Sequence, residues 1–223
     1  MTLVEVAVET LRSAVSAEVG GAGRIELCAN LDEGGTTADT ELIAAVSARV
    51  RIPVVAIVRP RPGGFEYSAV EIRSMLDGIA RARTLGVAGI VAGVLRPDGT
   101  VDVDRMREIV DAAGELPVTF HRAFDATPSL TDALEDAIAS GATRLLTSGG
   151  AATALDGAEV IAALVDQAHG RITIVAGGGI REHNVRDVIA RARVTEIHTR
   201  LSAGEELDEA RVRGLVEQAR DTP

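Results

Sequence analysis

Eight short runs of Val, Ile, Leu and Ala recur along the chain, and each is followed by a segment whose apolar residues have helical spacing. After the second run, for example, Leu42, Ile43 and Val46 share one helical face. The runs cover residues 3–8, 24–28, 54–58, 89–94, 118–120, 144–147, 172–176 and 196–198, and a last helix is expected over 206–220. Because no linker-like stretch interrupts the alternation, we predict one α/β domain over residues 1–223, a (β/α)8 barrel of the TIM type.

Glycines support this division. Five of them fall between a helix and the next strand, where a left-handed helix end is expected: Gly20, Gly86, Gly114, Gly141 and Gly170. An open, doubly wound sheet is the alternative fold. It would normally carry a G-x-G-x-x-G turn after the first strand, where this chain has Glu9 and Thr10.

Polar residues alternate with aliphatic ones inside several runs. In the first run Val4, Val6 and Val8 share one face and Glu5 lies on the other. The aliphatic faces should pack on the helices, so the polar faces should line the barrel. Most polar positions fall late in their strands, at the end where barrel active sites lie. Buried ion pairs without chemistry, such as Glu5 with Arg59, are the alternative interpretation.

Composition narrows the class of function. The 223 residues are 46% hydrophobic and 2% aromatic, and the net charge of −10 disfavours binding to nucleic acid or to an anionic membrane. Cys28 is the one cysteine, so no internal disulfide forms. The absence of lysine excludes Schiff-base and Walker-type phosphate chemistry. The first twenty residues do not have the pattern of a signal peptide, so we expect a cytoplasmic protein.

The segment 119–125 concentrates reactive side chains at the end of the fifth run. His121 can move a proton or bind a metal, Arg122 can hold a carboxylate or phosphate, and Asp125 can orient the histidine or act as a base. With Glu26, His121 and His198 would also suit a divalent metal. A structural histidine bonded to a carboxylate is the alternative. We predict His121, Asp125 and Glu26 as catalytic residues.

Two glycine-rich turns, 147–150 and 177–180, follow the sixth and seventh runs. Glycine lets backbone N–H groups approach an anion closely, although simple tight-turn geometry would explain the same residues. Three arginines near strand ends would add positive charge. The predicted anion-binding set is Arg59, Arg61, Arg122, Ser148, Gly149, Gly178 and Gly179.

Together these segments resemble the CutC family of copper homeostasis proteins. The matching stretches are 24–29, 33–35, 57–61, 118–125, 146–149 and 177–180 with Asn184, and Thr-Phe-His-Arg-Ala-Phe-Asp at 119–125 is the most specific. The resemblance implies a barrel fold, a cytoplasmic homo-oligomer and a copper-related role. It implies a bound copper ion with Cys28, His121 and His198 as metal ligands.

Three functions therefore remain open. The resemblance implies copper binding in copper homeostasis. The polar strand ends and glycine turns favour an enzyme acting on a small anionic metabolite, phosphorylated or not, through His121 and Asp125. The third is a barrel that binds a small ligand without turnover. In each case the expected partner is a small anionic ligand or a metal ion, with no nucleic acid and no membrane.

Overall fold

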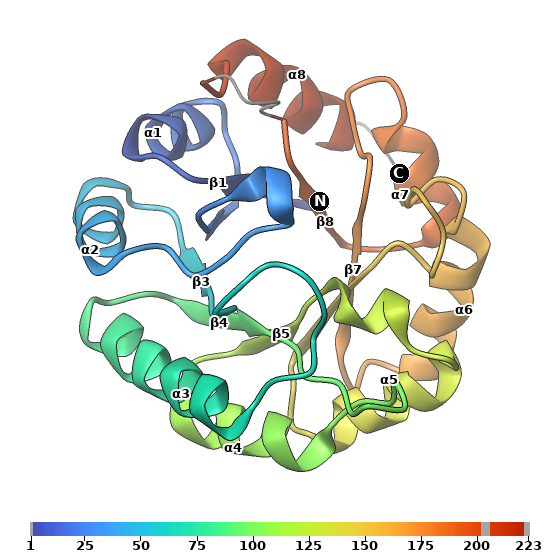
Figure 1. Cartoon of the computed structure of the whole chain (residues 1–223). Coiled ribbons are helices and arrows are strands. Elements are labelled where there is room, and N and C mark those ends of the chain that lie inside the picture. Colours follow the sequence, from blue (N-terminus) through green and yellow to red (C-terminus); the bar gives the residue numbers. More distant parts are fainter. Residues whose placement is uncertain (1, 202–205, 221–223) are drawn as a thin grey trace.

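The computed structural model describes residues 2–201 and 206–220, in which eight strands alternate with eight α-helices. The strands are β1 (Leu3–Val8), β2 (Arg24–Leu27), β3 (Val54–Ile57), β4 (Gly89–Ala92), β5 (Val118–Phe120), β6 (Arg144–Thr147), β7 (Thr173–Gly177) and β8 (Glu196–Thr199). The helices are α1 (Leu11–Val19), α2 (Thr40–Arg49), α3 (Ala69–Thr84), α4 (Val103–Ala113), α5 (Leu130–Ala139), α6 (Ala158–Ala168), α7 (Val185–Ala192) and α8 (Glu209–Arg220). The strands close into a parallel barrel, and the helices surround it (Figure 1). The predicted (β/α)8 fold is confirmed.

Strand alternation separates two apolar regions, one of which, inside the barrel, was not predicted. Val4, Val6 and Val8 of β1 belong to the large aliphatic layer between the strands and the helices. Ala7 and Cys28 point the other way, into a small cluster inside the barrel that they share with Leu31, Val55, Ile57 and Val91. The aliphatic faces therefore pack on the helices, and the polar faces line the barrel.

Ion pairs lie inside the barrel near the N-terminal ends of the strands. Arg24 donates from Nε to Glu5 and from Nη2 to Glu196, each over 2.5 Å. Arg144 approaches the same Glu196 carboxylate at 3.3 Å. Removing one member of such a buried network leaves an uncompensated charge, which costs about 3–5 kcal/mol. The alternative interpretation expected a buried ion pair of Glu5 with Arg59. Glu5 does form a buried ion pair, but its partner is Arg24, whereas Arg59 donates to backbone carbonyl groups.

Several predicted boundaries differ from the structure. Strands β2, β3 and β4 end before residues 28, 58 and 94, β7 lies one residue later than predicted, and α8 begins at Glu209. Gly20 is right-handed, with φ −71°, and the neighbouring Gly21 takes the left-handed conformation, with φ 90°. Gly86, Gly114, Gly141 and Gly170 do have positive φ, as predicted. Among the described helices, none has the length and apolarity needed to cross a membrane.

Candidate functional site

A cavity of about 370 Å³ opens where the strands end at the mouth of the barrel. Its lining includes residues predicted from the sequence and others that were not. The lining residues are Ala7, Glu26, Leu31, Gly34, Ile57, Arg59, Phe65, His121, Arg122, Leu146, Gly178, Gly179, Arg181, His198 and Arg200. Glu26, His121 and His198 therefore border one space, which is the arrangement that strand parity predicts.

Three neighbouring strands bring Glu5 together with two residues of the cavity lining, Glu26 and His198. His198 of β8 donates from Nδ1 to Glu5 of β1 over 2.7 Å, while Arg24 holds the second oxygen of Glu5. The imidazole is thus oriented by a carboxylate, and its Nε2 remains for the cavity. Glu26 of β2 lies close enough that a ligand atom of each group falls within 4.8 Å of the others. Oε2 of Glu26 is buried and has no hydrogen-bond partner.

The surroundings of Glu5 and Glu26 shift the pKa values of their carboxyl groups in opposite directions. Burial favours the neutral form of Glu5, but the hydrogen bond and charge of His198, together with Arg24, lower its pKa to about 2. Burial raises the pKa of Glu26 to about 7, against the opposing charge of His198. The pKa of His198 is raised: burial lowers it, but the charge of Glu26 and the bond to Glu5 prevail. Two carboxyl groups whose environments separate their pKa values in this way have the character of an acid–base site.

His121 lies after β5 and borders the same cavity. Its Nδ1 accepts a hydrogen bond from the N–H of Ala123 over 3.2 Å, so the ring proton resides on Nε2, which is buried and unpartnered. Burial and then the charge of Arg59 lower the pKa of His121 to about 3, so the ring is neutral. Gly93 lies behind it, where a Cβ would approach Nδ1 to 2.5 Å. His121 is therefore a fixed, neutral N–H donor.

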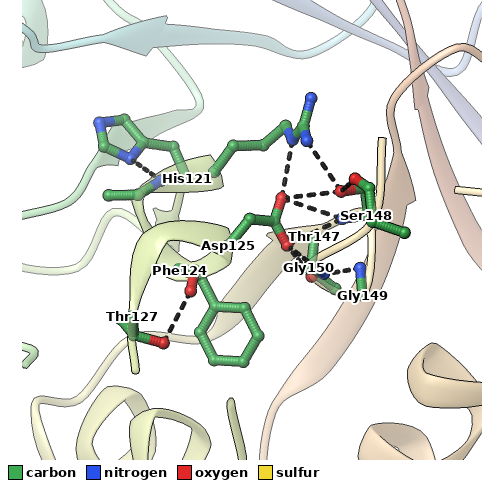
Figure 2. A network of polar contacts seen from close by, with 11 residues as sticks. His121, Phe124, Asp125, Thr127, Thr147, Ser148, Gly149 and Gly150 are labelled. Atoms are coloured by element: carbon green, nitrogen blue, oxygen red, sulfur yellow. Dashed lines mark hydrogen bonds and ion pairs between the residues drawn. The ribbon is translucent and has the colours of Figure 1, made fainter. Parts of the chain in front are cut away.

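Asp125, which the sequence predicts as a catalytic residue, is hydrogen-bonded to other groups of the protein. Figure 2 shows its carboxylate at the centre of a hydrogen-bond network that spans residues 122–150. Oδ1 accepts from Oγ1 of Thr147 over 2.5 Å and from the N–H of Gly150 over 3.0 Å (Figure 2). Oδ2 accepts from Nε of Arg122 over 2.8 Å, and the N–H and hydroxyl of Ser148 add further bonds. Asp125 is absent from the cavity lining, so it holds the loop after β5 against the turn after β6.

The two glycine turns differ in what occupies them. In the turn after β6, the N–H groups of Ser148 and Gly150 donate to Asp125, and Gly149 donates to Thr147. Those donors, predicted to bind an external anion at Ser148 and Gly149, are satisfied by the protein itself. In the turn after β7, the N–H groups of Gly178 and Gly179 have no acceptor among the described residues.

Two arginines lie beside this second turn. A Cβ on Gly178 would lie 3.4 Å from Nη1 of Arg122, whose other nitrogens are held by Asp125 and by Ser148. Arg181 donates from Nη1 to the carbonyl of Ile180 over 2.7 Å and forms no ion pair with a described residue. The turn after β7 thus combines free N–H groups with positive charge, which suits a small anion.

The two other predicted arginines have structural contacts. Arg59 is buried, donates to the carbonyl groups of Glu33, Gly35 and Gly63, and packs over the Phe65 ring at 5.1 Å. It borders the cavity but holds its loops together. Arg61 lies outside the cavity lining, where its Nε donates to Glu71 over 2.5 Å. The expectation that Arg61 contributes to this anion site therefore gains no support from its position.

The predicted metal set is not brought together. Among the described residues, Glu5, Glu26 and His198 form the group whose ligand atoms converge, and Cys28 and His121 are outside it. Cys28 is fully buried and donates to the carbonyl of Val8, and burial raises the pKa of its thiol well above the usual range. Copper(I) prefers thiolate and thioether ligands, so neither the protonated thiol nor the carboxylate-rich group fits it.

Glu5, Arg181 and Phe65 are among the site residues that were not predicted from the sequence. Glu5 was considered only as an ion-pair residue, although an acid inside an otherwise aliphatic strand is a recognisable signal. Arg181 directly follows the glycine turn 177–180, a placement that could have drawn attention to it. Phe65 contacts the His121 ring with centroids 5.1 Å apart, and no local pattern marks it.

Comparisons with known proteins agree with one another. The sequence matches the CutC family over residues 2–219. A CutC-named family protein of Chromobacterium violaceum is 45% identical over 88% of this chain and 79% of that protein. A mouse protein named copper homeostasis protein cutC homolog is 44% identical over 88% of this chain and 72% of its own length. The crystal structure of a CutC protein from Streptococcus agalactiae, 31% identical, superposes with a TM-score of 0.86 over 91% of this chain and all of the other. This chain therefore belongs to the CutC family.

Proposed function

We propose that the cavity at the mouth of the barrel binds a small anionic molecule and transfers protons to and from it. The observation that carries this proposal is the group of Glu5, Glu26 and His198, in which an oriented imidazole adjoins a buried carboxyl with a free oxygen. A carboxyl group with a pKa of about 7 is available as both acid and base near neutral pH. The residues proposed to act are Glu26 and His198, with Glu5 as the positioning residue.

The anion would lie at the turn after β7, next to the strand that carries His198. Arg122, Arg181 and the N–H groups of Gly178 and Gly179 support this placement, because they supply charge and donors that the described residues leave available. A cavity of about 370 Å³ suits a small metabolite. Asp125, predicted as a catalytic residue, positions Arg122 in this proposal and touches no ligand.

Calorimetric titration with inorganic phosphate tests the binding step. We expect wild-type protein to bind phosphate, Arg181→Gln to weaken binding about tenfold, equivalent to about 1.4 kcal/mol, and Arg213→Gln to bind as wild type. Arg213 is the matched control because it lies on α8 and pairs with Glu209. If wild type does not bind phosphate at millimolar concentration, the anion site is wrong.

Carbon-13 NMR titration of the glutamate side chains tests the acid–base step. One carboxyl resonance should titrate near pH 7, and this resonance should be missing from Glu26→Gln. A protein in which every assigned glutamate titrates below pH 5 would contradict the proposed role of Glu26, whatever the result with phosphate.

A role in copper homeostasis is the second candidate. The name copper homeostasis protein cutC homolog, borne by the mouse relative and by a human relative that is 43% identical, supports it. Copper(I) binding through Cys28 would need the thiol to lose its contact with Val8 and its proton. The oxygen and nitrogen donors of Glu5, Glu26 and His198 suit a divalent ion better. Titration with copper(I) separates the possibilities: stoichiometric binding that Cys28→Ser abolishes would support a copper ligand, and equal weak binding by both proteins would contradict it.

A further inference from the structure

We propose that the reaction at the barrel mouth is enolisation: removal of a proton from the carbon next to a carbonyl in a small phosphorylated hydroxy-carbonyl compound. This inference rests on the proposed function and names its substrate class. Three sets of groups carry it: the proton-transfer group on β1, β2 and β8, the neutral imidazole after β5, and the anion turn after β7.

The imidazole of His121 indicates that the substrate carries a carbonyl group. Its Nε2–H is buried and has no partner, and the His121 side chain lines the same cavity as Glu26. Leaving a buried donor unpaired is unfavourable, so an acceptor on the ligand is the natural partner. Because Nδ1 accepts a hydrogen bond from the N–H of Ala123, the ring carries its proton on Nε2, from which it can donate to a ligand but cannot take a proton away. A neutral imidazole of this kind polarises a carbonyl oxygen.

Glu26 identifies the second feature, an acidic C–H bond. Its Oε2 is buried and accepts no hydrogen bond from any described residue. A base that is desolvated and unbonded is suited to removing a proton from carbon, which forms no strong hydrogen bond beforehand. The positioned imidazole of His198 lies beside it.

The anion turn identifies the third feature. Gly178 and Gly179 have φ angles of 116° and 69°, conformations that favour glycine and leave their N–H groups without an acceptor among the described residues. Arg122 and Arg181 border the same cavity. Two N–H groups and two guanidinium groups supply more donors than a carboxylate accepts readily, so we assign a phosphate to this position.

The step consumes no proton and releases none overall. Glu26 takes the proton, the C–H electron pair forms the new carbon–carbon double bond, and the carbonyl π electrons move to the oxygen bonded by His121. Protonated Glu26 then returns its proton to the former carbonyl carbon, and the hydroxyl proton moves between the two oxygens. The product is the isomeric hydroxy-carbonyl compound, so no oxidant, reductant or co-reactant is needed.

Binding of an enediolate mimic tests the inference without knowledge of the exact substrate. The probe is phosphoglycolohydroxamate, and glycerol 3-phosphate is the matched ligand with the same phosphate but no planar oxygen-bearing centre. We expect calorimetry to show at least ~100-fold tighter binding of the hydroxamate by wild-type protein, since mimics of an unstable intermediate bind far better than ground-state analogues.

Two substitutions at different strands protect the test against a misfolded variant. His121→Gln and Glu26→Gln should each reduce the ratio of the two affinities below tenfold while leaving the affinity for glycerol 3-phosphate within about twofold of wild type. If wild type binds both ligands equally, enolisation is wrong and anion binding stands. If neither ligand nor inorganic phosphate binds, the proposed function itself fails. A ratio that both substitutions leave unchanged would also overturn the roles of His121 and Glu26.

Discussion

Asp125 and Glu26 are both carboxylates near the mouth of one barrel, yet their surroundings are opposite. The Asp125 side of the mouth, between β5 and β6, surrounds the acid with donors from Arg122, Thr147, Ser148 and Gly150 (Figure 2). The Glu26 side, on β1, β2 and β8, leaves one acid oxygen without any partner. A satisfied acid stabilises a loop, whereas an unsatisfied buried acid is costly and available for chemistry. Residue type alone does not separate these roles.

Asp125→Asn should change the free energy of unfolding more than any of the other substitutions. A small change would mean that Asp125 and Glu26 do not differ as described. The amide NH2 of Asn would face donors that now meet a carboxylate oxygen, so several buried donors would lose their acceptor. We expect the free energy of unfolding to fall by about 3 kcal/mol in urea denaturation. Asp104→Asn is the control, because Asp104 is exposed and paired with Arg107 only at 3.5 Å, and it should change stability by less than about 0.5 kcal/mol. Similar small losses in both variants would remove the structural role of Asp125.

Glu26→Gln should raise the free energy of unfolding, whereas Asp125→Asn should lower it. The folded-state pKa of about 7 lies above the usual 4.5, so the ionised carboxylate opposes folding, and wild type loses stability as the pH rises from 4.5 through 7. Glu26→Gln has no ionisable group at this position, so it does not lose this stability. Its advantage over wild type should grow by about 1–2 kcal/mol between pH 5.5 and pH 8 in urea denaturation.

Glu5→Gln is the matched control for Glu26→Gln, because it makes the same change on the neighbouring strand. The folded-state pKa of Glu5 is about 2, below the usual value of 4.5, so its ionised form supports folding above pH 4.5. Glu5→Gln should therefore destabilise the protein at both pH 5.5 and pH 8. Equal effects of the two substitutions would show that the two acids are not in different environments.

The two glycine turns give a third test. Gly150→Ala and Gly178→Ala both place a side chain at positive φ, 70° and 116°, and each should cost about 1 kcal/mol of unfolding free energy or somewhat more. Only Gly178→Ala should also weaken phosphate binding, by about tenfold in calorimetry, because the turn at Gly150 is already occupied by Asp125. Equal loss of phosphate affinity in both variants would show that the turns do not differ.

Arg61→Gln should have the smallest effect. The side chain is 40% exposed, pairs with Glu71 and lies outside the cavity lining. We expect less than about 0.5 kcal/mol change in stability and no change in phosphate affinity. A loss of affinity as large as that of Arg181→Gln would restore Arg61 to the anion site predicted from its place beside Arg59.

The sequence by itself determined the repeating strand–helix pattern, the barrel and the faces that line its interior. These follow from local periodicity: Val4, Val6 and Val8 must share one face of an extended strand, and Glu5 must take the other. The same rule brought Glu26, His121 and His198 to one cavity.

Only the tertiary structure decided which polar groups are free and which are satisfied. Asp125 and the turn 147–150 are separated by more than twenty residues, and nothing local predicts that one would occupy the other. Cys28 faces the barrel interior, as its alternation with Ile25 and Leu27 predicts. Its place in the small apolar cluster there, outside the group of Glu5, Glu26 and His198, depends on neighbouring strands. Hydrogen-bond satisfaction and pKa depend on the distances between atoms that the fold brings together, and a strand's own sequence carries no record of them.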